Sequence, residues 1–280
     1  MSFAADYLAH LEAFAAHSAL PRVRTLHLPP PDDDACTPGK GEFCALELDD
    51  GSIGLSYVLL DDTLTRLHAA DHGRELAGAD PLAIARRYAA HDGFGRTIGF
   101  AAANALTRCL FDRAGFRPDP SGDSIGRMDP QPGERIGMIG LFRPLLARII
   151  ERGARLTVVE LKAELAGDNP DYRVTLDAAE LAGCSKVLST STLLLNDTLD
   201  RMLAACRDAR WFAMVGPGAG CLPDALFARG VTLLGGSWIV DPPAFVDALV
   251  RGATTSEWSY KFALTPESYP GFPSLLERMP

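Results

Sequence analysis

Histidine is missing from the second part of this chain. All six histidines lie within the first 91 residues, and residues 92–280 contain none. A serine hydrolase triad or a conventional zinc hydrolase centre therefore cannot be built from the second part alone, because both depend on imidazole groups. Any imidazole that serves a site in the second part must come from the first 91 residues.

Long apolar runs and a basic excess are also missing. No apolar run is long enough for a membrane-spanning helix, and the start of the chain lacks the basic and unbroken apolar regions of a signal peptide. We therefore expect a cytoplasmic protein. The net charge of −9 is spread evenly, since residues 1–117 carry 11 basic and 16 acidic side chains and the remainder carry 16 and 20. Neither a nucleic acid nor a membrane is an expected partner.

The six cysteines form no CxxC pair, and reduced thiols are expected in the cytosol. One of them, Cys36, lies in an acidic loop with the sequence PPPDDDACTPGKG. Carboxylates and thiols are both plausible metal ligands, so a cation site is one interpretation. A mobile acidic loop without a ligand is the other, and the spacing matches no known metal motif.

Residues 1–117 are predicted to form an α+β domain. A helix over 3–19 precedes strands at 23–28, 43–48 and 53–60, and Asp-Gly between the last two strands indicates a hairpin. Two helices follow, at 81–90 and 97–113. Asn104 lies on the small-residue face of the second helix, where it either makes a buried hydrogen bond or contacts a ligand.

Residues 118–133 are rich in proline and glycine and are predicted to be a linker. Short apolar strands then alternate with helices over 134–264, which predicts a Rossmann-like parallel sheet with helices on both faces. The five expected strands are 135–141, 156–160, 186–189, 211–215 and 231–234. The expected helices are 144–152, 176–182, 197–207, 223–229 and 242–251. Residues 265–280 are expected to form an irregular strap that packs across the first domain.

The first strand of this sheet leads into the turn IGMIGLFRP. It lacks the GxGxxG spacing of dinucleotide-binding turns, because Ile139 and Phe142 stand where glycines are needed. Gly140 and Arg143 are still ligand candidates, since a helix start binds anions. Glu160, at the end of the next strand, either binds a ribose-like hydroxyl or faces water.

Two further loops at strand ends are candidates. The loop after the third strand is rich in hydroxyl and amide groups, and we consider Ser189, Thr190, Asn196 and Thr198 as a polar ligand cradle. The alternative is structural, with Asn196 capping the next helix.

The loop after the fourth strand, VGPGAGCLP, contains three glycines that allow close backbone approach, and Gly216, Pro217 and Gly218 are ligand candidates. Cys221 lies near a helix N-terminus, where a thiolate is stabilised. It is our tentative metal ligand or nucleophile, and a simple loop residue is the alternative. Trp238, in a fifth loop, is interpreted as a lid or a contact between domains.

Together the segments IGMIGLF, STSTLLLNDTLD, VGPGAGCLP and GVTLLGGSWIVDP, with IGFAAANAL in the first half, resemble the two-domain family named for heavy-metal chelation, formerly a domain of unknown function. The resemblance implies an enolase N-terminal-like α+β domain followed by a Rossmann-like domain, with a site in the cleft between them. It also implies binding of a heavy or transition metal of unspecified identity. A hydroxyl residue usual in the family after Gly-Pro is replaced here by Gly218.

Two functions follow as expectations. The first is binding or chelation of a heavy metal or metal complex in the cleft between the domains. The second is an enzyme or binding protein for a small anionic or nucleotide-like metabolite in the same cleft. The sequence does not decide whether the protein is a catalyst, and it leaves a homo-oligomer open.

Overall fold

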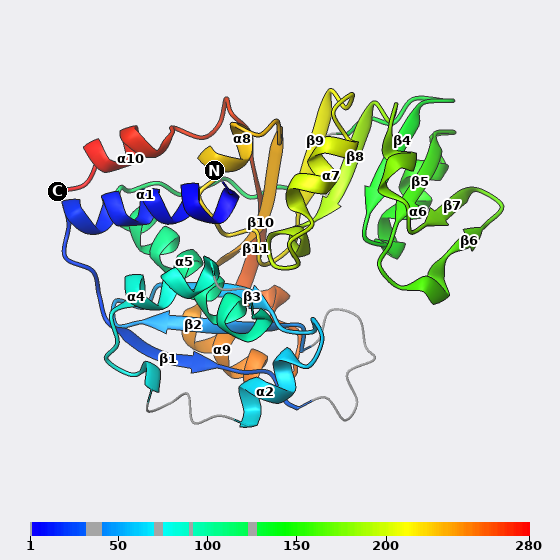
Figure 1. The fold of residues 1–280 in the computed structure, drawn as a ribbon. Helices are drawn as coiled ribbons and strands as arrows, with labels where there is room; N and C mark the ends of the chain where they lie inside the picture. The colour runs from blue at the N-terminus through cyan, green and yellow to red at the C-terminus, as the bar shows by residue number, and fades with distance from the viewer. Residues whose placement is uncertain (1, 32–40, 70–74, 90–91, 123–127) are drawn as a thin grey trace.

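The computed structural model describes residues 2–31, 41–69, 75–89, 92–122 and 128–280. They form a mixed α/β structure with a three-stranded antiparallel sheet and an eight-stranded, mostly parallel sheet (Figure 1). The acidic loop at 32–40, with its alternative cation site, lies outside the described residues. Among those that are described, no helix is both long enough and apolar enough to cross a membrane.

The small sheet is built from the first part of the chain. Helix α1 (Phe3–His17) precedes β1 (Val23–His27), β2 (Phe43–Leu48) and β3 (Ile53–Tyr57), which pair in that order. The predicted Asp-Gly hairpin is confirmed: Gly51 has a φ of 85° and joins β2 to β3. Glycine is suited to this turn because it reaches positive φ without a Cβ clash.

Helix α5 (Gly93–Arg113) covers one face of the small sheet, and Gly54 of β3 makes this close packing possible. A Cβ at Gly54 would lie 2.1 Å from the carbonyl oxygen of Ala101. The helix begins four residues earlier than predicted because the Asp92 side chain caps it by accepting a hydrogen bond from the Gly95 N–H. Before it lie α2 (Thr63–Ala69), which was not predicted, then α4 (Pro81–Ala85) and a 3₁₀ turn, η1 (Arg86–Ala89).

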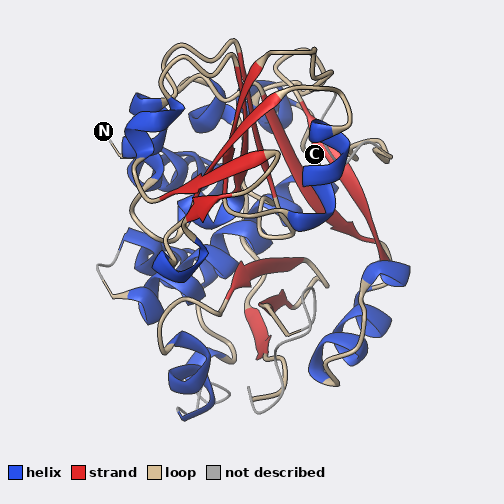
Figure 2. Cartoon of the chain, turned by 90° about the vertical axis from the view of Figure 1, so that its right-hand side faces the viewer, coloured by secondary structure: helices blue, strands red, loops and turns tan. Residues whose placement is uncertain are grey.

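The large sheet has the strand order β11-β10-β9-β8-β4-β5-β7-β6. Its members are β4 (Arg135–Ile139), β5 (Arg155–Val159), β6 (Gly167–Asp168), β7 (Tyr172–Thr175), β8 (Lys186–Thr190), β9 (Trp211–Val215), β10 (Leu233–Ile239) and β11 (Ser259–Leu264). The six central strands are parallel, and the two edge strands, β6 and β11, are antiparallel to their neighbours. The predicted parallel sheet is confirmed, and its pronounced twist is visible in Figure 2.

Three strands of this sheet were missed. β6 is exposed and β7 is partly exposed, so these short strands lack the apolar run by which buried strands are recognised, and residues 259–264 of β11 were assigned to no element. The strand predicted at 231–234 is β10, which continues through two glycines to Ile239 because β11 pairs with it along its full length. The predicted loop at 235–239 is therefore wrong.

The helices of the second part are shorter than predicted. They are α6 (Arg143–Ile150), the 3₁₀ turn η3 (Ala178–Leu181), α7 (Leu199–Ala205), α8 (Asp224–Phe227) and α9 (Pro242–Val250). The short 3₁₀ segments η2 (Ala163–Leu165), η4 (Ser191–Leu194) and η5 (Ser256–Trp258) complete this part. The largest difference is at α7, which has seven residues where eleven were expected, and α8 is a single turn of four residues where seven were expected.

Helix α9 connects the two parts of the molecule. It follows the large sheet in sequence, yet it packs against β1 and β2 of the small sheet, below β10 and β11 in Figure 1. Phe245 and Leu249 of α9 share a buried apolar cluster with Leu55 of β3 and Ile239 of β10. The small sheet therefore lies between α5 on one face and α9 on the other.

The last residues lie along the first helix. The stretch expected to be irregular contains α10 (Phe272–Glu277), which contacts α1 and α5 (Figure 1). Asp224 of α8 anchors it by accepting hydrogen bonds from the Tyr269 hydroxyl at 2.7 Å and from the Phe272 N–H at 2.9 Å. The Phe272 ring packs edge-on against the imidazole of His10.

Candidate functional site

The predicted loops meet at one edge of the large sheet. β4, β8, β9 and β10 are neighbours and parallel, so their carboxyl ends lie side by side. Gly140 faces the Thr190 methyl group, since a Cβ on the glycine would lie 3.2 Å from it. Gly216 is packed still more tightly, because a Cβ there would lie 2.3 Å from the Ser191 hydroxyl oxygen. These glycines are required for packing between loops.

Glu160 holds the first turn in place. Its carboxylate accepts hydrogen bonds from the N–H groups of Leu141 and Leu161. These bonds give the side chain a structural role, and its predicted contact with a ribose-like hydroxyl stays a prediction. Glu160 fixes the turn at Gly140, and Arg143, the first residue of α6, is exposed at the surface beyond this turn.

The polar groups of the hydroxyl-rich third loop form hydrogen bonds within the loop itself. Thr190 Oγ1 accepts from the Thr192 N–H at 3.2 Å, and the Ser189 hydroxyl is buried and donates to the Thr190 carbonyl. Asn196 accepts from both the N–H and the hydroxyl of Thr198. The cap residue of α7 is Thr198, so the alternative in which Asn196 caps this helix is wrong.

The same loop is docked on the first part of the chain. Tyr88 donates a hydrogen bond to the Leu194 carbonyl, and Arg96 of α5 pairs with Asp197, whose φ is 57°. The ligand roles predicted for Ser189, Thr190, Asn196 and Thr198 stay predictions. The geometry supplies a structural role for each of these polar groups.

Asn104 joins three elements around the glycine loop at 216–220. Its amide group donates to the Leu55 carbonyl at 2.9 Å and to the Gly218 carbonyl at 3.0 Å, and its oxygen accepts from the Tyr7 hydroxyl. Of the two interpretations left open, the buried hydrogen bond is the one observed. Asn104 therefore fixes the glycine loop against α1 and β3 instead of presenting an amide to a ligand.

Cys221 is a buried thiol. Desolvation by burial raises its pKa to about 12, so the thiol is protonated near neutral pH. The predicted thiolate is wrong because α8 is only one turn long, and burial outweighs any stabilisation from the helix start. The metal role proposed for Cys221 stays a prediction, and Cys44, Cys109 and Cys206 are likewise buried thiols with raised pKa values of about 12.

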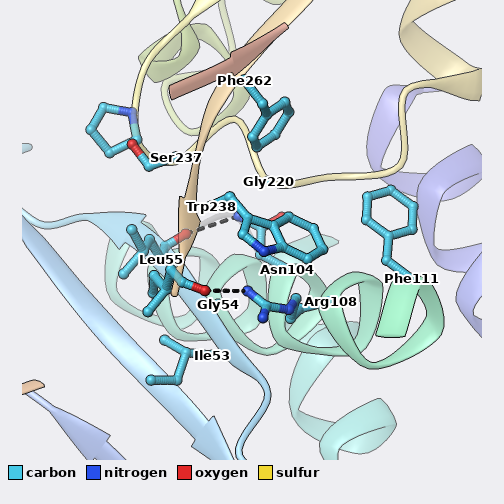
Figure 3. A pocket seen from close by; sticks show the side chains of 12 residues that line it. Ile53, Gly54, Leu55, Asn104, Arg108, Phe111, Gly220, Ser237, Trp238 and Phe262 are labelled. Carbon is cyan, nitrogen blue, oxygen red and sulfur yellow. Dashed lines mark hydrogen bonds between the residues drawn. The ribbon is translucent and has the colours of Figure 1, made fainter. Parts of the chain in front are cut away.

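Trp238 is a contact between the two parts and not a lid. Its ring stacks on Phe111 of α5 at an interplanar angle of 16°, and the Arg108 guanidinium lies 3.9 Å from the ring centroid. A small cavity of about 30 Å³, room for roughly one water, lies beside this stack and next to Asn104 (Figure 3). The Arg108 guanidinium also donates to the Ile239 carbonyl, which ties α5 to β10.

A much larger cavity, of about 310 Å³, lies over one face of the β10–β11 ribbon. Its lining residues come from the ribbon, the glycine loop and the start of α6, and they are mainly apolar or small: Ser121, Phe142, Pro144, Leu145, Val215, Gly216, Pro217, Leu233, Gly235, Gly236, Ser237, Lys261, Phe262 and Ala263. Gly235 pairs with Ala263, and Ser237 pairs with Lys261. The small side chains on this face leave the space open, and the volume lies in the range of small-molecule sites, which begin at roughly 300 Å³.

A third cavity, of about 100 Å³, adjoins the large one. Both are lined by Pro217 and Ser237, and the third extends to Glu42 and Phe43 at the start of β2 and to Phe245 of α9. Residues from both parts of the chain therefore surround Pro217 and Ser237. We name the two adjoining cavities the ribbon cavity (about 310 Å³) and the β2 cavity (about 100 Å³).

The structure places the predicted residues unequally around these cavities. Gly216 and Pro217 line the ribbon cavity, whereas Gly140, Arg143 and Glu160 are not among its lining residues. Ser237 and Lys261 were missed. Ser237 lay in a segment read as a loop, and Lys261 in a strand without an apolar run; the one available signal was the Gly-Gly-Ser sequence, whose small residues mark close approach to a strand.

The described side chains do not bring together the ligands that a bare metal ion needs. Among the described residues, no group of three or more His, Cys, Asp or Glu side chains is close enough to hold a metal ion. Three of the four described histidines form hydrogen bonds elsewhere: His10 to the Asp6 carbonyl, His27 to Glu47 and His68 to the Pro29 carbonyl. The described protein side chains therefore do not form a complete metal coordination sphere.

A family model carries the description "Putative heavy-metal chelation", domain of unknown function 364, and matches residues 123–266. The chain belongs to this family. The match covers β4 to β11, and with them the whole ribbon cavity apart from Ser121.

Solved structures of the same family share the fold. A protein of unknown function from Pyrococcus horikoshii is 18% identical with a TM-score of 0.63, and one from Desulfitobacterium hafniense is 19% identical with a TM-score of 0.65. Each comparison covers 92% of this chain and 99% of the other. An uncharacterized protein of Methanocaldococcus jannaschii is 29% identical over 151 residues, 52% of this chain, and the chain spans about half (55%) of that relative's length.

Proposed function

We propose that the protein binds a heavy metal as a complex with a small organic chelator, in the ribbon cavity beside the β2 cavity. The observation that carries the proposal is the cavity itself: about 310 Å³ is far more than a bare ion needs, and its lining suits an organic molecule. The description of the family supports a heavy metal as part of the ligand. Because the described residues offer no cluster of metal-binding side chains, the chelator supplies the metal's ligands.

The lining also favours an anionic complex. Lys261 is exposed at the cavity and has no acidic partner among the described residues, while the remaining lining is uncharged. Carboxylate chelators leave a net negative charge on many of their metal complexes, and an unpaired lysine attracts such a charge. A metal-free organic anion is the second candidate function, since the same lysine and apolar wall suit it equally.

A substitution that fills the ribbon cavity tests the site. Ala263→Leu adds three carbons on the strand face that lines the cavity, whereas Ala147→Leu makes the same change on the exposed surface of α6. Each protein is titrated calorimetrically with nickel and with zinc, given as the chloride, as the citrate complex and as the histidine complex, and with each chelator alone. We expect a metal complex to bind the native protein, and Ala263→Leu to weaken binding at least about tenfold, a loss of about 1.4 kcal/mol.

The controls separate the alternatives. Ala147→Leu and Cys221→Ala are expected to bind as the native protein does, because neither residue lines the cavity. Binding of the free chelator as tight as that of its complex supports the second candidate function. Tight binding of the chlorides that Ala263→Leu does not change would contradict the proposal, and a loss of that binding in Cys221→Ala would show that the thiol is a ligand after all.

A further inference from the structure

The ribbon cavity and the β2 cavity lie in a row along one face of the β10–β11 ribbon. Strand pairing places Gly235 opposite Ala263, Ser237 opposite Lys261 and Ile239 opposite Ser259. Paired residues share a face of the sheet, so these side chains follow one another along the ribbon. The ribbon cavity covers the first two pairs and the β2 cavity reaches Ser237 and Ser259, which makes Ser237 the point where they adjoin.

The two cavities carry opposite charges. Lys261 is the charged residue that lines the ribbon cavity, and Glu42 is the charged residue that lines the β2 cavity. Neither has an ion-pair partner within the described ranges. As far as the described residues show, both charges can therefore pair with a ligand.

Glu42 is the acidic group that the described lining of the β2 cavity offers to a ligand. Burial raises the pKa of the Tyr57 hydroxyl, and the carboxylates of Glu42 and Glu160 raise it further. Both carboxylates thus act on one phenol at the junction of the two parts. The hydroxyl of Ser259 already donates to the Thr255 carbonyl, so Glu42 is the group in the β2 cavity that is best placed to receive a cation.

From this arrangement we infer that the organic part of the ligand is zwitterionic, with an apolar body in the ribbon cavity, an anionic group at Lys261 and Ser237, and an ammonium group toward Glu42. This inference rests on the proposed function and narrows it to chelators that carry an ammonium group in addition to the donor atoms that hold the metal, because a protonated amine has no lone pair for a metal. An all-carboxylate molecule leaves Glu42 unpaired beside a second negative charge. A molecule with only amine groups would place a second positive charge beside Lys261.

The test uses three small molecules that share one apolar ring. These are 4-methylbenzoate with only the anion, benzylamine with only the cation, and 4-(aminomethyl)benzoate with both. Their dissociation constants are measured by NMR titration of the full-length native protein. We expect 4-(aminomethyl)benzoate to bind roughly twofold to fivefold more tightly than either of the others, the usual value of one partly exposed ion pair.

Two variants assign the charges. Lys261→Gln is expected to remove the preference for the carboxylate, and Glu42→Gln to remove the preference for the ammonium group, each without changing the other. Lys162→Gln and Glu257→Gln are matched controls on exposed residues that line neither cavity, and they are expected to keep both preferences.

The outcomes distinguish this inference from the proposed function. Equal binding of the three molecules, or preferences that survive in Lys261→Gln and Glu42→Gln, would overturn the inference. If Ala263→Leu still abolishes binding of a metal complex in that case, the proposed function stands. Conversely, if the protein binds no metal complex but shows the expected charge preferences, the inference of a zwitterionic ligand is supported and the proposed metal binding is contradicted.

Discussion

Asn104 illustrates how a single residue ties the candidate site to the rest of the fold. An amide on an alanine-rich helix face predicts burial, because small neighbours allow another segment to come close. The sequence therefore indicated that Asn104 would either make a buried hydrogen bond or contact a ligand. It could not identify the partners, since the Gly218 carbonyl and the Tyr7 hydroxyl lie 114 and 97 positions away along the chain.

Cys221 shows the opposite case, in which local sequence was misleading, and Glu160 has backbone partners that local sequence did not reveal. Cys221 lies near a predicted helix start, but the thiol is enclosed by the core and stays protonated. Glu160 has the position of a ribose-binding acid, but the turn of the preceding strand uses its carboxylate. In both cases tertiary neighbours determine the chemistry, and no pattern of spacing reports them.

Glu134 carries the clearest pH-dependent contribution to stability. Burial alone would raise its pKa, but hydrogen bonds from the Ser185 hydroxyl and the Gln131 N–H, together with Lys186, lower the pKa from 4.5 to about 2. A carboxylate with a depressed pKa stabilises the folded state above the unfolded pKa. That stabilisation is lost as pH falls from about 5 toward about 2.

We therefore predict that Glu134→Gln lowers the free energy of unfolding by about 3 kcal/mol at pH 7, with a smaller difference from the native protein at pH 3. Urea denaturation at a series of pH values measures this difference. Asp247→Asn, which removes an exposed ion pair with Arg251, is the control and is expected to change stability by less than about 1 kcal/mol. A constant deficit of Glu134→Gln across the whole series would contradict the assigned pKa.

At the scale of elements, packing between β3 and α5 is one of the tightest contacts of the first part. The predicted order of elements in this part, three strands followed by helices, is confirmed. The glycine that permits the contact carries no local signal, since Gly54 lies inside a strand and its φ is ordinary. Its role is visible only when α5 is in place.

Gly54→Ala is predicted to destabilise the protein by about 3 kcal/mol or more, because the added methyl group would lie against backbone atoms of Ala101 and Ala105 that cannot move independently. Gly122→Ala is the matched control, since a Cβ at Gly122 meets nothing within 4 Å. Thermal and urea denaturation measure both. A Gly54→Ala protein as stable as Gly122→Ala would show that the helix and strand can separate at little cost.

The whole molecule is more integrated than the division into 1–117, 118–133, 134–264 and 265–280 suggests, and that division stays a proposal. One apolar core extends from Phe3 to Met279, and α9 covers a face of the small sheet. Without α9, the face formed by Ala45, Ile53 and Leu55 would be exposed. We therefore regard the two parts as structurally dependent on each other.

A fragment of residues 1–117 is accordingly predicted to remain unfolded, as measured by circular dichroism and urea titration. In the full chain, Phe245→Ala should lower the free energy of unfolding by about 3–5 kcal/mol, because it removes the buried ring that fills the shared cluster. Val250→Ala, at an exposed position of the same helix, should cost less than about 1 kcal/mol. A fragment that unfolds cooperatively would establish the first part as an independent domain.

The sequence by itself determined the two sheets, their order in the chain, the hairpin at Gly51 and the family, because hydrophobic periodicity and turn residues are local signals. Tertiary structure alone decided where the cavities lie. β10 and β11 form a ribbon only through pairing between residues about 25 apart. Ser237 and Lys261 acquire their place at the candidate site from that pairing. The physical reason is that a cavity is defined by which long-range neighbours are close and which are absent, and neither is encoded in any short stretch of the chain.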